Sequence, residues 1–362
     1  MALKKETLKS EVKTLWQQKA KPIPMREYAK QTADTEKLML FSETGAGKTR
    51  FYLNILDYLH DIKKIPKEKI KMCIVMPDRP TGLTKLYGII PKEYIDCIDV
   101  FPVNQYEDTI VATATAHEIL AEHYKNSGFH GYLVFELTEN YWSFSQDYFC
   151  RQAYGQTMGE FFAQMQSIMG KNKADKKTAY EAFAGPFGGP WPIIKFFHNF
   201  NWIDKIKRYP YNIIFTSELK EEDNADSIFK SLGYRPAGEK HNQHRMDTIL
   251  YLSHKGERFF MKPYKLTGYE KLYAQIDITK KNGYHEHMKA LKELEKRGFR
   301  VSPIKELEKE AGITPPKPKP KKPKKEEPTE EITLDGKDHE PEKVSQKELT
   351  KKPPVEDDEW SF

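Results

Sequence analysis

Cysteine is scarce in this chain, with three residues, Cys73, Cys97 and Cys150, in 362 positions. So few and widely spaced cysteines exclude a disulfide-stapled scaffold and a cysteine-rich zinc module, and they favour a reducing compartment. Long apolar runs are also lacking. No stretch approaches the roughly 18 apolar residues of a membrane span, and the opening segment MALKKETLKSEV lacks the apolar core of a signal peptide. We therefore expect a cytoplasmic protein with no membrane partner.

Aliphatic residues are few after position 313. Residues 314–362 contain 11 Lys, 13 Asp or Glu and 9 Pro. Such a composition cannot bury enough apolar surface to offset the entropy lost on ordering, so we predict a disordered, charged tail. Because the whole chain has a formal charge of +6, this slightly acidic tail leaves about +8 on the remainder.

Short apolar runs alternate with helical periodicity from residue 37 onward. This pattern predicts an α/β fold with a mainly parallel sheet covered on both faces, and ligands bind such sheets at the carboxyl ends of the strands. Two further strands flank the turn SHKGE as an antiparallel hairpin at the far edge of the sheet. The predicted strands are 37–42, 69–77, 96–103, 131–137, 211–217, 247–252 and 258–263, and the predicted helices are 50–64, 106–124, 140–166 and 190–208.

The segment SETGAGKT, residues 42–49, lies between a predicted strand and a predicted helix, which is the context that a phosphate-binding loop requires. Glycines let the backbone aim several N–H groups at one anion, and the helix N-terminus adds its positive dipole end. Lys48 can then reach the β- and γ-phosphates, and the Thr49 hydroxyl can ligate Mg²⁺. Ser42 departs from the usual glycine, and a plain glycine turn is the alternative interpretation. The predicted nucleotide-binding residues are Thr44, Gly45, Ala46, Gly47, Lys48, Thr49 and Arg50.

Residues 36–268, which include this loop, resemble RecA-like P-loop ATPases of the phage and archaeal-virus recombination type. The resemblance implies ATP and Mg²⁺ as ligands, and a prokaryotic or virus-infected cell as the setting. Glu136, after the segment GYLVF, matches the acidic Walker B residue that holds the metal together with Thr49, although the family normally has Asp there. Two carboxylates compete for the role of catalytic base, Asp78 and Glu139.

The same resemblance implies further roles near the ends of later strands. Thr216, Ser217 and Glu218 match the polar sensor of the γ-phosphate. Lys262 and Lys265 match basic residues that reach into the nucleotide of a neighbouring subunit, so Lys48, Asp78, Glu136, Glu139, Lys262 and Lys265 form the predicted catalytic set, and a homo-oligomeric ring or filament is expected. The alternative for the last two lysines is a solvated pair on an edge strand.

A lysine-rich stretch with following aromatic residues interrupts the core pattern between residues 170 and 190. Basic side chains that neutralise phosphates, with aromatic rings on which bases stack, suit single-stranded DNA, and the alternative is a solvated loop. The predicted DNA-binding residues are Lys171, Lys173, Lys176 and Lys177. The pairs His241/His244 and His285/His287 lack a third ligand at a telling spacing, so we predict surface histidines rather than a metal site.

We thus divide the chain into a basic N-terminal arm (1–35), a RecA-like ATPase core (36–268), a helical appendage (269–313) and the tail (314–362). The tail ends in acidic residues followed by Trp360 and Phe362, a tip that suits a protein partner with an apolar pocket and a basic rim. The overall expectation is an ATP-hydrolysing protein that acts on DNA in recombination, repair or replication support. A DNA-packaging motor and a nucleotide-gated adaptor with little hydrolysis are the alternatives.

Overall fold

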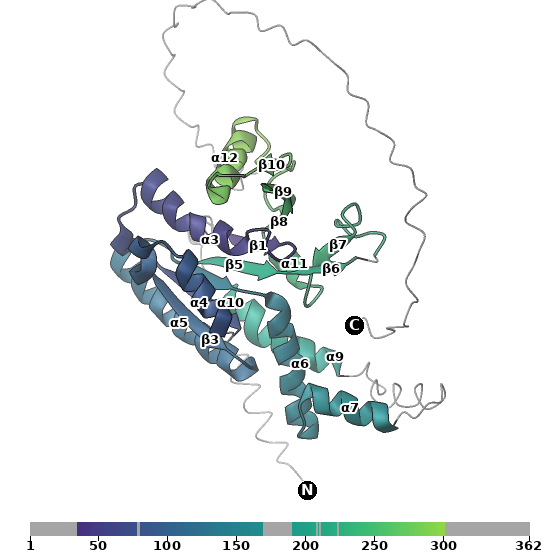
Figure 1. Cartoon of the computed structure of the whole chain (residues 1–362). Helices are drawn as coiled ribbons and strands as arrows, with labels where there is room; N and C mark the ends of the chain where they lie inside the picture. The colour runs from purple at the N-terminus through teal and green to yellow at the C-terminus, as the bar shows by residue number, and fades with distance from the viewer. Residues whose placement is uncertain are drawn as a thin grey trace, which may run out of the picture. The chain divides into compact units, whose positions relative to one another are not determined.

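An eight-stranded mixed sheet organises the computed structural model (Figure 1), which describes residues 35–300 except 78–79, 169–189, 208, 210 and 223. The strand order is β10-β9-β8-β1-β5-β4-β2-β3, and all pairs from β8 to β3 are parallel. β9 pairs antiparallel with β8, and β10 with β9. The predicted mainly parallel sheet with a hairpin at one side is confirmed. The strands are β1 (Lys37–Phe41), β2 (Met72–Pro77), β3 (Ile98–Val103), β4 (Tyr132–Phe135), β5 (Asn212–Ser217), β8 (Thr248–Lys255), β9 (Arg258–Leu266) and β10 (Ile276–Asp277).

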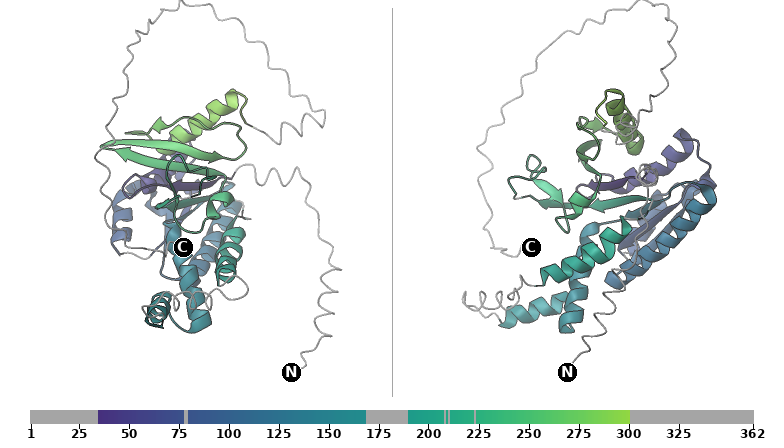
Figure 2. Two further views of the ribbon diagram at one scale, coloured as in Figure 1. Left: turned by 90° about the vertical axis from the view of Figure 1, so that its right-hand side faces the viewer. Right: turned by 180° about the vertical axis from the view of Figure 1, so that it is seen from behind.

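Helices cover both faces of the sheet, and alternate residues of the central strand β1 point to the two faces. Leu38 and Leu40 lie in one core with residues of α3 (Lys48–Asp57) and α12 (Gly283–Lys296). Met39 and Phe41 lie in the other, with α5 (Tyr106–Ser127), α6 (Thr138–Tyr154) and the π-helix η4 (Phe196–Ile203). In Figure 2 the purple α3 and the yellow-green α12 accordingly lie on one side of the sheet and the blue α5 on the other.

Several shorter elements differ from the predicted pattern. The predicted helix 140–166 is interrupted, because Gly155 at φ 68° ends α6 before α7 begins. The polar segment after β5 contains a two-stranded sheet of β6 (Leu219–Glu221) and β7 (Tyr234–Pro236), and α4 (Pro80–Ile89) was not predicted. The other helical segments of the described part are η1 (Tyr58–Ile62), η2 (Lys67–Lys69), η3 (Lys92–Cys97), α7 (Met158–Ile168), α9 (Trp191–Lys195), α10 (Asp204–Ile206) and α11 (Asn242–Arg245).

The described part of the predicted appendage packs directly on the core. A methyl group added at Gly283, the first residue of α12, would lie 2.8 Å from Cδ2 of Phe51, so only glycine permits this approach of α12 to α3. The side chain of Asn282 caps α12 by accepting a hydrogen bond from the amide of His285, and it donates another to the carbonyl of Asn54. Residues 269–300 therefore form part of the same hydrophobic unit as the sheet.

A contact between the buried His287 and the half-buried Glu36 also fixes α12. His287 is fully buried, and its Nε2 lies 3.2 Å from Oε1 of Glu36, while the Tyr284 hydroxyl donates to the other carboxylate oxygen. The prediction of a surface histidine at position 287 was wrong, because spacing along the chain does not reveal a partner 251 residues away. Burial raises the pKa of Glu36, but the hydrogen bond and the charge of His287 outweigh it and hold the pKa below its ordinary value.

Some predicted features lie outside the described residues: the N-terminal arm, the tail, Asp78, and Lys171, Lys173, Lys176 and Lys177. Within the parts of the chain that the structure does describe, no helix is long and apolar enough to cross a bilayer.

Replacing Glu36 with Gln should destabilise the fold by about 3 kcal/mol, because it leaves the buried His287 without its charged partner. Replacing Glu293 of the same helix α12, which pairs with Arg297 at the surface, should cost less than about 0.5 kcal/mol. Urea unfolding of the full chain measures both. Equal losses in the two variants would contradict the assignment of the buried pair.

The same pair predicts a pH dependence. Since the folded chain lowers the pKa of Glu36 from 4.5, its contribution to the free energy of unfolding is complete above that value and is lost as the pH falls through the lower folded pKa. The difference between the wild type and Glu36→Gln should therefore shrink as the pH falls below 4.5.

Candidate nucleotide-binding site

The loop between β1 and α3 begins at the carboxyl end of a central strand. The amide of Ser42 donates to the carbonyl of Ser217 on the neighbouring β5, which continues the sheet by one residue. Gly45 and Gly47 then adopt φ of 85° and 94°, a left-handed conformation that favours glycine. The amide of Phe51 donates to the carbonyl of Gly47, so α3 starts directly after the loop. The first amides of a helix have no partner within it, and here they are available to an anion over the loop.

Lys48 folds back over this loop. Its ammonium donates to the carbonyl of Ser42 at 2.9 Å, to the Ser42 hydroxyl at 3.0 Å and to the carbonyl of Glu43 at 3.3 Å. Burial lowers the pKa of Lys48, against the opposing effect of the nearby carboxylates of Glu139, Glu218 and Glu136. Ser42, which departs from the usual glycine, thus has a specific function as an acceptor for the lysine.

The Thr49 hydroxyl meets the carboxylate of Glu136 although β5 separates β1 from β4. Thr49 Oγ1 donates to Glu136 Oε1 at 3.0 Å, and the hydroxyl of Tyr52 donates to the same oxygen at 2.6 Å. A hydroxyl and a carboxylate are the hard oxygen donors that suit Mg²⁺, which usually retains several waters. The residues present therefore fit the metal implied by the resemblance, in a site made of Thr49 and Glu136.

The sequence reasoning missed Tyr52. It stands one helical turn after Thr49 and is fully buried, so the spacing places both hydroxyls on one face of α3. Burial raises its pKa well above the ordinary value, and the charge of Glu136 adds to the effect. A buried tyrosine hydroxyl needs a partner, and that requirement was the available signal.

Further carboxylates line the same edge of the sheet. Oε2 of Glu139 accepts from the amide of Glu218 at 3.4 Å, and Glu218 Oε1 accepts from the Thr44 hydroxyl at 3.3 Å. Burial raises the pKa of Glu139, and the charge of Glu218 raises it further. The Thr216 hydroxyl accepts from the amide of Leu137, whose φ of 56° turns the chain sharply from β4 into α6. The structure thus brings the predicted sensor residues, Glu139 and the loop together.

The two lysines of β9 lie at different levels of the sheet. Lys262 is opposite Tyr251, which is opposite Phe41 at the end of β1, so it lies level with the start of the loop. Lys265 is opposite Ile249, which pairs with Met39 in the middle of β1, and its ammonium donates to the carbonyls of His244 and Met246, which precede β8. Burial lowers the pKa of Lys265, against the charge of Asp247. The cross-subunit role of both lysines stays a prediction.

The histidine pair 241/244 does not form part of a metal cluster. His241 is exposed and its Nδ1 lies 2.7 Å from the carboxylate of Glu239. In the described ranges, no group of three or more His, Cys, Asp or Glu side chains is arranged to hold a metal.

No protein-family model matches the chain, and no curated protein matches it. Among solved structures, the chain shows a distant similarity to an ATPase from the type III secretion system of pathogenic bacteria, with 12% sequence identity and a TM-score of 0.32. The match covers 60% of this chain and 52% of the ATPase, so the chain spans about half the length of that protein.

Replacing Tyr52 with Phe should raise the Mg²⁺ concentration needed for half-maximal ATP binding about 10-fold, because Glu136 loses one of its two donors. Titration of Mg²⁺ at fixed ATP measures the effect. Tyr106→Phe is the matched control, since it removes a buried hydroxyl that donates to the carbonyl of Phe197. The assignment of Tyr52 as a positioning residue fails if both variants shift the Mg²⁺ requirement equally.

Proposed function

We propose that this chain is a RecA-like P-loop ATPase that binds ATP with Mg²⁺, hydrolyses it, and acts on DNA. The observation that supports ATP and Mg²⁺ most directly is the hydrogen bond between Thr49 of the loop and Glu136 at the end of β4. It joins the two groups that a phosphate-bound metal needs, directly beside a loop of the correct sequence and backbone conformation.

Each residue of the site has a separate role in binding the nucleotide. The amides at the start of α3 and the ammonium of Lys48 bind the phosphates. Lys48 then replaces its hydrogen bonds to Ser42 and Glu43 with hydrogen bonds to phosphate oxygens. Thr49 and Glu136 would hold the metal, which would supply positive charge against the phosphates. Phosphoryl transfer then requires a group that positions the attacking water.

Glu139 is our candidate for that group. It lies among the charges that act on Lys48, and its raised pKa makes it a stronger base than a solvated carboxylate. Asp78, the competing candidate, lies outside the described residues. The contacts from Thr44 to Glu218 and from Glu218 to Glu139 would report the state of the γ-phosphate to the segment that follows β5.

Action on DNA and assembly into an oligomer extend this proposal. They are supported by the charge of about +8 outside the tail, by the four lysines between 171 and 177, and by Lys262 near the level of the loop. The alternative of an adaptor that binds ATP and hardly hydrolyses it is favoured by Glu136 at a position where the family has Asp.

Hydrolysis of ATP by the purified full chain, without DNA and with single-stranded or duplex DNA, tests the proposal. Lys48→Ala should lower the rate about 100-fold or more, because it removes a cation that stabilises charge developing on the phosphates. Lys85→Ala on the exposed surface of α4 is the control and should retain the wild-type rate.

Stimulation of ATP hydrolysis by single-stranded DNA supports a role in recombination. ATP binding without turnover in any condition supports the adaptor instead. If the wild type fails to bind ATP, or if Lys48→Ala hydrolyses it normally, the proposal is wrong.

A further inference from the structure

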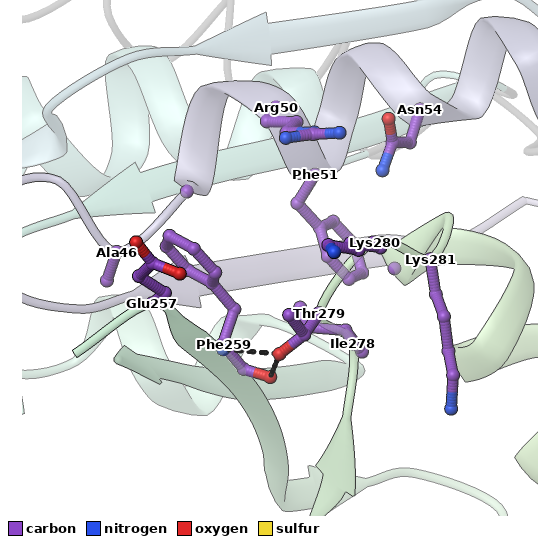
Figure 3. A pocket seen from close by; sticks show the side chains of 12 residues that line it. Ala46, Arg50, Phe51, Asn54, Glu257, Phe259, Ile278, Thr279, Lys280 and Lys281 are labelled. Atoms are coloured by element: carbon purple, nitrogen blue, oxygen red, sulfur yellow. Dashed lines mark hydrogen bonds between the residues drawn. The ribbon is translucent and has the colours of Figure 1, made fainter. Parts of the chain in front are cut away.

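The phosphate loop has different surroundings on its two sides. Toward β9, a cavity of about 200 Å³ adjoins the loop, and Ala46, Arg50 and Phe259 form part of its lining (Figure 3). Toward β5 and β4, where Glu136 and Glu139 lie, the chain that follows β5 packs against the start of α6. This second side contains the carboxylate that we assign to the attacking water, so the contacts that hold this carboxylate bear on hydrolysis.

Gly238 lies directly against the backbone of Glu139. A methyl group added at Gly238 would lie 3.3 Å from Cα of Glu139 and 3.4 Å from its amide nitrogen. Two carbon atoms in contact prefer a separation of about 3.5–4.0 Å, so a side chain here would push against the backbone of Glu139. Gly238 also has φ of 89°, a left-handed conformation that favours glycine. Glycine meets both requirements of this position.

Hydrogen bonds join Gly238 to the end of β5 through its neighbour Ala237. The amide of Ala237 donates to the carbonyl of Glu218 at 2.9 Å, and the Ser217 hydroxyl donates to the carbonyl of Ala237 at 3.2 Å. The amide of Glu218 also donates to Oε2 of Glu139. The end of β5 therefore contacts the side chain of Glu139 directly, and it holds the glycine that touches its backbone.

A buried polar chain attaches the other end of the segment 237–242 to the same helix. Nδ2 of Asn242 donates to Nε2 of His198 at 3.2 Å, and Nδ1 of His198 lies 3.1 Å from the hydroxyl of Ser145 on α6. The Ser145 hydroxyl donates its proton to the carbonyl of Tyr141, so it accepts from His198. Burial lowers the pKa of His198 to about 4, which keeps the ring neutral. The segment is thus fixed to α6 at two points.

We propose that Gly238 is a positioning residue for Glu139, and that the segment 237–242 holds the start of α6 where the Glu139 carboxylate can orient the attacking water. This inference rests on the proposed function, because it requires Glu139 to act on that water. It gives the segment a role in hydrolysis and none in ATP binding, since the phosphates bind the loop and the start of α3.

Steady-state hydrolysis and equilibrium ATP binding by the full chain test this separation. Gly238→Ala should lower kcat about 10-fold and leave ATP affinity unchanged, because a small misplacement of a catalytic group lowers the rate steeply. Gly233→Ala is the matched control. Gly233 also has a left-handed φ, 78°, but an added methyl group there would have no atom within 4 Å. The control should retain the wild-type kcat and ATP affinity.

A double-mutant cycle distinguishes positioning from a general structural effect. Glu139→Gln alone should lower kcat about 100-fold. Because Gly238 acts through Glu139, adding Gly238→Ala to Glu139→Gln should lower the remaining rate little further.

Asn242→Ala provides a second, independent variant, which also serves if Gly238→Ala does not fold. It removes the bond to His198 and leaves Gly238 in place. It should lower kcat without weakening ATP binding.

The inference is overturned if Gly238→Ala or Asn242→Ala retains the wild-type kcat, or if Gly233→Ala loses as much activity as Gly238→Ala. It is also overturned if Gly238→Ala weakens ATP binding as much as it lowers kcat, or if its effect is undiminished beside Glu139→Gln. A wild type that does not bind or hydrolyse ATP would instead contradict the proposed function itself, before any variant is compared.

Discussion

The contact between Glu136 and the first turn of α3 is the interaction on which the arrangement of the site depends. Neighbouring strands lie about 4.8 Å apart, so the insertion of β5 separates β4 from β1 by about 10 Å. The carboxylate bridges this separation because it receives two hydroxyl groups from α3, those of Thr49 and Tyr52. The longer side chain of Glu, compared with Asp, extends this reach by one methylene group. Glu at position 136 is therefore compatible with the geometry of the proposed metal site.

Before a ligand binds, three carboxylates at this edge of the sheet surround the single ammonium group of Lys48. The carboxylates of Glu136, Glu139 and Glu218 all act on the ammonium of Lys48, which burial partly desolvates. A polyphosphate adds further negative charge to this group. Binding without a divalent cation would place these like charges together at low dielectric, where their repulsion is strongest. A divalent cation at the proposed Thr49–Glu136 site would offset this repulsion.

Local sequence was sufficient to predict the loop, because glycine spacing, the preceding apolar strand and the following helix all act within one short segment. Most strands were predicted for the same reason. Tyr52 and the buried state of His287 were not, since both depend on partners brought close only by the tertiary fold. α4 was missed because Pro80, Gly82 and Gly88 obscure its helical periodicity. The placement of β5 between β1 and β4 is likewise a property of topology that periodicity does not encode.

The RecA-like resemblance ends at residue 268, but packing joins the described residues after it to the core. α12 is held to β1 by the pair of His287 with Glu36, and to α3 by the close approach of Gly283 to Phe51. The segment that connects β10 with α12 also lines the cavity beside the phosphate loop. A ligand that contacts both this segment and α3 binds only when α12 is docked, so by linkage it must stabilise the docked state.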